Sequence, residues 1–263
     1  MLSPLAGREL QRFPLEEVSV LAEVDSTNDE AKRRLQKNSS VLVVAQAQWR
    51  GRGRGSRSWE SPPGGLWFSL GFKEVLSKGS PSFIPILAGV AVADGLRSLG
   101  FAARIKWPND VLIEGKKVAG ILVEADTKEG EPTGLVIGIG INVNIPEKEL
   151  QEKVRETKVG TLMEIAGQRL DLLEVLTRVL QEFFYLWPLW RSGHLEPIRE
   201  RWGQLSSTLN RPVTVLDRRG GPKIEGIAVD LDPDGALLVR GPDGRLQPLF
   251  AGDFHNSGSW TPR

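Results

Sequence analysis

The sequence predicts an α+β fold, in which a larger N-terminal domain with a mixed β-sheet precedes a small C-terminal β-barrel. Up to residue 205, apolar and β-branched runs alternate with amphipathic segments, which indicates strands alternating with helices. From residue 212 onward the apolar runs are short and are separated by turn sequences such as Pro233-Asp234-Gly235. The chain has 263 residues, which suffices for one large domain and a small one.

The first part of the chain predicts three strands and one helix. An amphipathic segment follows Ser26 and Thr27, either of which can act as an N-cap, so we expect a helix at 29–36. The strands are rich in β-branched residues or alternate in polarity, and we place them at 16–24, 41–48 and 66–72.

The middle of the chain predicts two long helices with three strands between them. The first helix spans 83–99 and should end at Gly100, while the second spans 172–190 and should be interrupted by Pro188. A further helix is expected at 194–205. The strands are placed at 103–107, 118–125 and 134–144, with turns at Glu114-Gly115 and Glu129-Gly130.

The domain boundary is predicted near residues 209–212, which divides the chain into residues 1–210 and 211–263. Four short strands are expected in the second domain, and glycine-containing turns separate them. Such regular alternation is typical of a small barrel. The strands are placed at 213–216, 224–231, 236–239 and 246–250, and the turns at 219–221, 233–235 and 242–244.

Composition excludes several classes of function. Lys and Arg number 34 against 33 Asp and Glu, so a globally basic nucleic-acid-binding protein is not expected. The absence of cysteine excludes disulfides and thiolate metal sites, and two histidines leave little material for other metal centres. The sequence shows neither a signal peptide nor a membrane-spanning segment, so we expect a cytoplasmic protein without membrane contact.

The most distinctive segment is the arginine–glycine loop, residues 50–57, in which the two residue types alternate after a predicted strand. Glycines let backbone N–H groups approach an anion, and arginines supply forked donors for phosphate or carboxylate. We therefore expect a loop that closes over a phosphorylated ligand, with a solvated basic turn as the alternative. A dinucleotide-binding fingerprint is disfavoured because Ser61-Pro62-Pro63 prevents a helix directly after the glycines.

Two segments further along also carry groups suited to a ligand. The turn 106–110 (Lys-Trp-Pro-Asn-Asp) offers the oxygens of Asn109 and Asp110 to a cation. Lys117 begins the next apolar strand, where it can offset negative charge at a reaction centre. The alternative is an ordinary Asn-Asp hairpin followed by solvated lysines.

The predicted strand at 134–144 contains Gly138 and Gly140. Glycine weakens a strand unless another group must come close, so a close approach competes here with a β-bulge. In the first case Asn142 would offer its amide to a ligand or to a neighbouring loop.

In this order, five segments of the chain resemble the biotin protein ligase family. The resemblance implies a mixed-sheet catalytic domain similar to class II synthetases at 1–210, followed by an SH3-like domain at 211–263. The segments are 25–28 (Asp-Ser-Thr-Asn), Gln48 with 51–54 and Trp59, 106–110, 117–124, and 138–143.

The resemblance implies a ligase that makes biotinyl-5′-AMP from biotin and ATP with Mg²⁺. It would then transfer biotin to a lysine of a biotin carboxyl carrier protein. The implied catalytic residues are Lys117, Arg54, Asp110 and Lys106, with Asp110 as the metal ligand. The implied biotin-binding residues are Ser26, Thr27, Asn28, Gln48, Gly51, Arg52, Gly53, Arg54, Lys117 and Gly120. The implied ATP-binding residues are Arg54, Lys106, Asn109, Asp110, Lys117 and Asn142.

Some members of the family carry an N-terminal DNA-binding domain and act as repressors. The first strand is expected at residue 16, so we expect no such domain, no DNA binding and no repressor activity. A homodimer is a further expectation from the family. The rival hypotheses are a lipoate or octanoate transfer enzyme, which the 106–110 segment disfavours, a nucleic-acid-binding regulator, and a structural scaffold.

Overall fold

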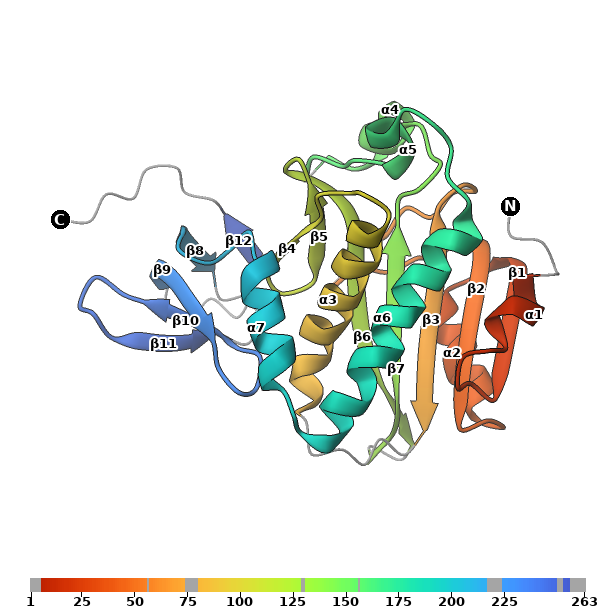
Figure 1. Ribbon diagram of the computed structural model, residues 1–263, viewed down its shortest axis with the longest axis horizontal. Coiled ribbons are helices and arrows are strands. Elements are labelled where there is room, and N and C mark those ends of the chain that lie inside the picture. Colours follow the sequence, from red (N-terminus) through yellow and green to blue (C-terminus); the bar gives the residue numbers. More distant parts are fainter. Residues whose placement is uncertain are drawn as a thin grey trace.

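The computed structural model describes residues 6–55, 57–73, 80–128, 131–155, 157–216, 224–249 and 253–255. Within these ranges the chain forms a seven-stranded sheet, of order β1-β2-β3-β7-β6-β5-β4, and a five-stranded sheet, of order β11-β10-β9-β8-β12 (Figure 1). The predicted α+β class and the small C-terminal β unit are confirmed.

The larger sheet is mixed, as predicted. Its first two strands are parallel and are joined through helix α2 (Thr27–Leu35), whereas the remaining pairs in this sheet are antiparallel. One strand, β5, was not predicted, because four residues between two turns show no readable periodicity. The strands are β1 (Glu17–Val24), β2 (Ser40–Gln48), β3 (Leu66–Lys73), β4 (Arg104–Lys106), β5 (Asp110–Ile113), β6 (Lys116–Lys128) and β7 (Glu131–Ile141).

Both faces of this sheet are covered by helices. Successive strand residues point to opposite faces, so in β2 Val41 and Val43 pack with α2, while Leu42 and Val44 join the main core. That main core lies under α3 (Ile84–Ser98) and α6 (Leu172–Ser192), which run side by side across the other face (Figure 1). Val41 to Val44 are all fully buried, because each face of the sheet has a helical cover.

The predicted interruption at Pro188 is wrong, because α6 runs through it without a break. Proline inside a helix costs about 3 kcal/mol through a lost hydrogen bond and a steric clash. Here Pro188 lies on the exposed side of α6, while Trp187 and Trp190 on either side of it are buried in the core. The packing of these two indoles stabilises the helix beyond the proline.

The remaining helices are short or lie near the second sheet. Helix α7 confirms the predicted helix, whereas α1, α4, α5 and the 3-10 turn η1 were not predicted, since each has too few residues for a periodic pattern. Their bounds are α1 (Ala6–Leu10), η1 (Pro81–Phe83), α4 (Glu147–Lys153), α5 (Leu162–Ala166) and α7 (Glu196–Leu205). None of the helices in the described ranges combines the length and apolar character needed to cross a membrane.

The C-terminal sheet contains the four predicted strands and an additional one, β12. Gly235 and Gly244 have φ angles of 84° and 80°, as the predicted glycine turns require. The predicted turns at 129–130 and 219–221 lie outside the described residues. The strands are β8 (Pro212–Leu216), β9 (Ile224–Leu231), β10 (Leu237–Arg240), β11 (Leu246–Leu249) and β12 (Asp253–His255).

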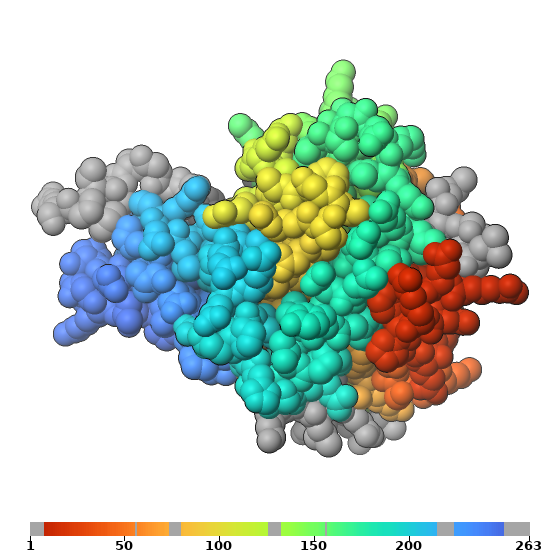
Figure 2. All heavy atoms as spheres, viewed as in Figure 1, coloured from red at the N-terminus to blue at the C-terminus, as the bar shows by residue number. Residues whose placement is uncertain are grey.

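The second sheet packs against the first domain. In the space-filling view it forms a lobe beside the larger body, with α7 between it and α3 (Figure 2). Its apolar side chains join the main core, and the indole N–H of Trp107 donates to the carbonyl of Gly235 at 3.1 Å. The turn that carries Asn109 and Asp110 is therefore anchored to the C-terminal sheet.

Candidate active site

A cavity of about 1160 Å³ lies on the face of the large sheet that also carries α2. This volume exceeds the ~300–1,000 Å³ typical of a pocket for one small ligand. The lining includes every residue predicted for the site except Gly51, so five segments distant in sequence meet here. Gly51 is packed inside the hairpin of the arginine–glycine loop instead, where a Cβ would be 2.3 Å from the carbonyl oxygen of Trp59.

One end of the cavity is neutral and polar. Gln48 is held by Thr27, whose backbone N–H and hydroxyl both donate to Gln48 Oε1, at 2.7 and 3.0 Å. Gln48 Nε2 in turn donates to Ser61 Oγ at 2.9 Å. Ser26 precedes α2 as predicted, but its hydroxyl makes no capping hydrogen bond. Ser26, Thr27 and Asn28 are all buried.

Two serines at this end were not predicted as site residues. Ser69 Oγ lies 2.7 Å from Thr27 Oγ1 and 2.6 Å from Asn28 Oδ1, so it fixes both side chains. The available signal was a hydroxyl residue in the middle of β3, whose neighbours along the strand up to Phe72 are apolar or glycine. Ser61 gave no such signal, because it lies in a loop rich in serine, proline and glycine.

The glycines of β7 form the floor of the cavity. A Cβ at Gly138 would lie 2.2 Å from Asn28 Oδ1, and one at Gly140 would lie 2.5 Å from Trp59 Nε1. β7 pairs with both neighbours in regular register at these positions, so the predicted close approach is confirmed and the bulge is wrong. Gly120 of β6 extends the floor beneath the same indole.

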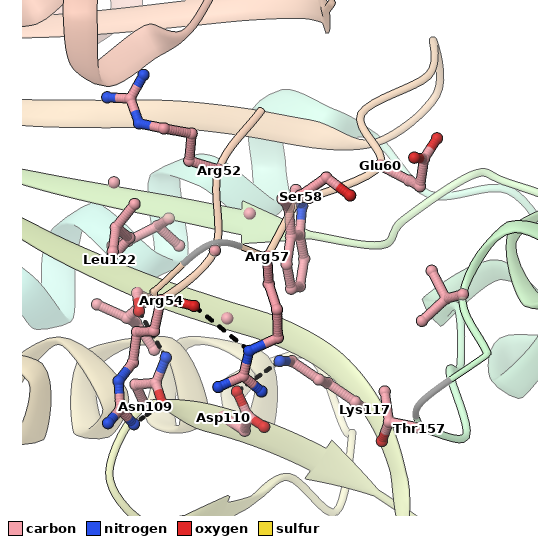
Figure 3. Close-up of a pocket in the computed structure, with 18 of the residues that line it drawn as sticks. Arg52, Arg54, Arg57, Ser58, Glu60, Asn109, Asp110, Lys117, Leu122 and Thr157 are labelled. Carbon is pink, nitrogen blue, oxygen red and sulfur yellow. Dashed lines mark hydrogen bonds and ion pairs between the residues drawn. The ribbon is translucent and has the colours of Figure 1, made fainter. Parts of the chain in front are cut away.

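The arginine–glycine loop folds back on itself as a short hairpin. Gly53 N–H donates to the carbonyl of Arg57 at 2.8 Å, and Trp59 N–H donates to the carbonyl of Gly51 at 2.9 Å. Arg54 reaches the turn 106–110, where its guanidinium donates to Asn109 Oδ1 at 3.1 Å. Arg52 points away from Arg54 (Figure 3) and pairs with Asp29 of α2.

The other end of the cavity is cationic. Lys117 Nζ forms an ion pair with Asp110 Oδ1 at 2.6 Å and lies 5.0 Å from the centre of the Trp59 ring (Figure 3). Lys106, Arg54 and other basic side chains line the same end. Arg54 engages Asn109 Oδ1 and Lys117 pairs with Asp110 Oδ1, so in this structure one oxygen of each predicted cation ligand already faces a basic side chain.

The described residues contain no group of three or more carboxylate, histidine or cysteine side chains that could hold a metal ion. Glu60 and Asp110 are the carboxylates among the lining residues described. This arrangement suits Mg²⁺ that arrives with a nucleotide, since that ion is commonly held by one or two carboxylates together with substrate phosphates.

The last wall of the cavity comes from the segment after α4. Lys117 N–H donates to the carbonyl of Lys158, and Gly160 N–H donates to the carbonyl of Lys117, both at 2.9 Å. Asn142 is buried and its amide donates to Gly160 O at 3.1 Å, so it serves a neighbouring loop. Lys153 and Arg155, which also line the cavity, were missed because basic residues at a helix end are typical of any solvated surface.

This fold and cavity define a class of protein ligase. The Biotin/lipoate A/B protein ligase family matches residues 20–142, and the Biotin protein ligase C terminal domain matches residues 208–255. Among curated proteins, the bifunctional ligase/repressor BirA of Escherichia coli is 34% identical over 240 residues, covering 90% of this chain and 73% of that protein.

The alignments with two further relatives cover nearly the whole length of those proteins. The biotin--[acetyl-CoA-carboxylase] ligase of Paracoccus denitrificans is 34% identical, over 86% of this chain and 95% of that protein. The solved structure of the biotin protein ligase from Aquifex aeolicus in complex with biotin and ATP has a TM-score of 0.75 and 31% identity, over 91% of this chain and 98% of that chain. The chain belongs to the biotin protein ligase family, and it is a ligase.

Proposed function

We propose that this ligase forms biotinyl-5′-AMP from biotin and ATP, and then transfers biotin to a lysine of a biotin carboxyl carrier protein. The observation that carries the proposal is one cavity with a neutral polar end and a cationic end. A substrate with an uncharged polar head and a carboxylate, together with a nucleoside triphosphate, matches these two ends.

The polar end suits the ureido ring of biotin. That ring has two N–H donors and one carbonyl acceptor, and Ser26, Thr27, Asn28 and Gln48 supply hydroxyl and amide partners. Their fixed orientation through Ser69 and Ser61 lowers the entropic cost of binding. The aliphatic tail of biotin would then lie along the glycine floor and the Trp59 indole.

In the first step, a carboxylate oxygen of biotin attacks the α-phosphorus of ATP. The new P–O bond forms a mixed anhydride as the bond to the bridging oxygen of pyrophosphate breaks. Both reactants are anions, so their approach needs cations at the reaction centre. Lys117, Arg54 and Lys106 supply these charges, and Asp110 would hold the Mg²⁺ that accompanies ATP and neutralises phosphate charge.

In the second step, the neutral amine of the acceptor lysine attacks the acyl carbon of the intermediate. The C–N bond forms, AMP leaves with the C–O bond electrons, and the proton that the amine loses passes to solvent. Because the mixed anhydride hydrolyses in water, the arginine–glycine loop must exclude solvent until the acceptor arrives. The repressor activity in the name of the bacterial relatives is not part of this proposed reaction.

The test is the intact mass of a biotin carboxyl carrier domain after incubation with this protein, biotin, ATP and Mg²⁺. We expect a gain of one biotinyl group, and no gain when ATP is omitted. A mass gain with lipoate or octanoate but not with biotin would support the ligase reaction but show that biotin is not the substrate. No gain with any of these acids would overturn the proposed reaction.

A further inference from the structure

The arginine–glycine loop is tied to the rest of the domain by an ion-pair network around Arg52. Its guanidinium donates to both carboxylate oxygens of Asp29, at 2.6 and 2.7 Å, and to Glu124 Oε2 at 3.0 Å. Asp29 lies in the first turn of α2, and Glu124 lies on β6. Arg52 therefore joins the loop to a helix and to a strand, with a bidentate geometry that also fixes its direction.

Glu124 links this network to the polar end of the cavity. It accepts a hydrogen bond from Asn28 Nδ2 at 3.1 Å and forms an ion pair with Lys32 at 3.1 Å. Burial would raise the pKa of Glu124, but the hydrogen bonds from Arg52, Asn28 and Lys32 lower it below its usual value. The bidentate bonds from Arg52 likewise lower the pKa of Asp29. Both carboxylates are therefore ionised at neutral pH, and two cations face two anions.

Backbone hydrogen bonds within the hairpin couple the position of Arg52 to that of Arg54. Arg52 and Ser58 form an isolated β-bridge, and Gly53 N–H donates to the carbonyl of Arg57. The side chains of Arg52 and Arg54 point to opposite sides of the hairpin (Figure 3). The ion pairs of Arg52 hold one side, and Arg54 lies over the cationic end of the cavity on the other side. Release of Arg52 would free the hairpin to lift from the cavity.

We propose that Arg52, held by Asp29 and Glu124, is a positioning residue that keeps the arginine–glycine loop closed and so limits the escape of activated biotin to lysines other than that of the acceptor. The part about escape rests on the proposed function, whereas the part about closure does not. The side chain of Arg52 then acts through the loop.

The closure is tested with trypsin, which cleaves after the arginines that this loop contains. The variant Asp29→Asn removes one charge from the network without touching the cavity lining. Glu30→Gln is the matched control, because Glu30 lies in the same first helical turn but pairs with Arg33 and Arg34 instead. Asp29→Glu keeps the charge and should restore slow cleavage.

We expect the loop of Asp29→Asn to be cleaved about fivefold faster than that of the unmodified protein, the effect of losing a partly exposed ion pair of about 1 kcal/mol. The cleavage positions are identified by the masses of the fragments. Equal cleavage rates for Asp29→Asn and Glu30→Gln would overturn the proposed role of Arg52. A rate for Asp29→Glu as high as that for Asp29→Asn would overturn it as well.

The escape of activated biotin is measured separately, as biotin attached to serum albumin in the presence of biotin, ATP and Mg²⁺ but no acceptor domain. We expect about fivefold more labelling with Asp29→Asn than with Glu30→Gln. Unchanged labelling together with faster cleavage would show that closure does not control escape. If the unmodified protein forms no biotinyl-5′-AMP, the proposed function fails while the trypsin result still decides the role of Arg52.

Discussion

The replacement Lys117→Gln tests the cationic end of the cavity directly. In the free protein the Lys117 ammonium is 2.6 Å from Asp110, and the lysine side chain is only 18% exposed. Glutamine keeps a polar side chain but removes the charge that offsets repulsion between a carboxylate and a polyphosphate. Removal of one preorganised donor from a developing charge costs ~3–4 kcal/mol, which corresponds to a decrease of about 100- to 1,000-fold in rate.

The assay is the rate of pyrophosphate release at saturating biotin and MgATP. Lys116→Gln is the matched control, because Lys116 is the neighbouring residue but pairs with Glu147 at 2.7 Å outside the cavity lining. We expect the control to stay within about twofold of the unmodified protein, as is usual for an exposed ion pair. Loss of the mostly buried Lys117–Asp110 pair should lower the free energy of unfolding by about 1–3 kcal/mol.

A rate for Lys117→Gln within about tenfold of the unmodified protein would refute the reasoning, because it would leave less than about 1.4 kcal/mol for the charge. An equal loss in Lys116→Gln would refute it differently, by showing that the effect is not local to the cavity. Thermal unfolding of both variants separates these results from a general loss of structure.

Three further predictions follow from other contacts. Arg54→Gly should still release pyrophosphate but should label bystander lysines, because the loop loses its bond to Asn109; unchanged acceptor selectivity would contradict this. Gly138→Ala should weaken biotin binding and lower stability by about 1–3 kcal/mol, because its Cβ would lie 2.2 Å from the oxygen of buried Asn28; isothermal titration and thermal unfolding measure both effects, and normal biotin affinity would count against the close approach. Finally, hydrogen bonds from Arg33 lower the pKa of Asp25 from 3.8 to about 2. This pair should therefore stabilise the fold fully above pH 3.8 and lose its effect as the pH falls towards about 2. In Asp25→Asn, the free energy of unfolding should no longer fall between pH 3.8 and about 2 because of this pair. If its pH dependence is the same as in the unmodified protein, solvent screens the pair.

Local patterns were sufficient to predict most of the fold. The run of β-branched residues at 41–48 and the apolar stretch at 83–99 predicted β2 and α3, because backbone preference and burial agree in such segments. The patterns failed where an element is too short to have a period, as in β5, and where packing outweighs a local preference, as at Pro188 in α6.

The sequence by itself also indicated which segments line the cavity. Glycines in the interior of β7 indicated either a close approach or a β-bulge, and the structure shows the close approach. The alternation of arginine and glycine indicated an anion-binding loop, and the order of five segments indicated the family. These inferences need only the chemistry of residues that are neighbours in the chain.

Only the tertiary structure decided which side chains meet. Arg52 lines the cavity, and its guanidinium pairs with Asp29 and Glu124, which lie 23 and 72 positions away in the sequence. Ser69 reaches Thr27 across 42 positions. The order and register of the strands set such contacts, because a shift of one residue turns every side chain of a strand to the opposite face. That register arises from the packing of the whole domain, and no single segment encodes it.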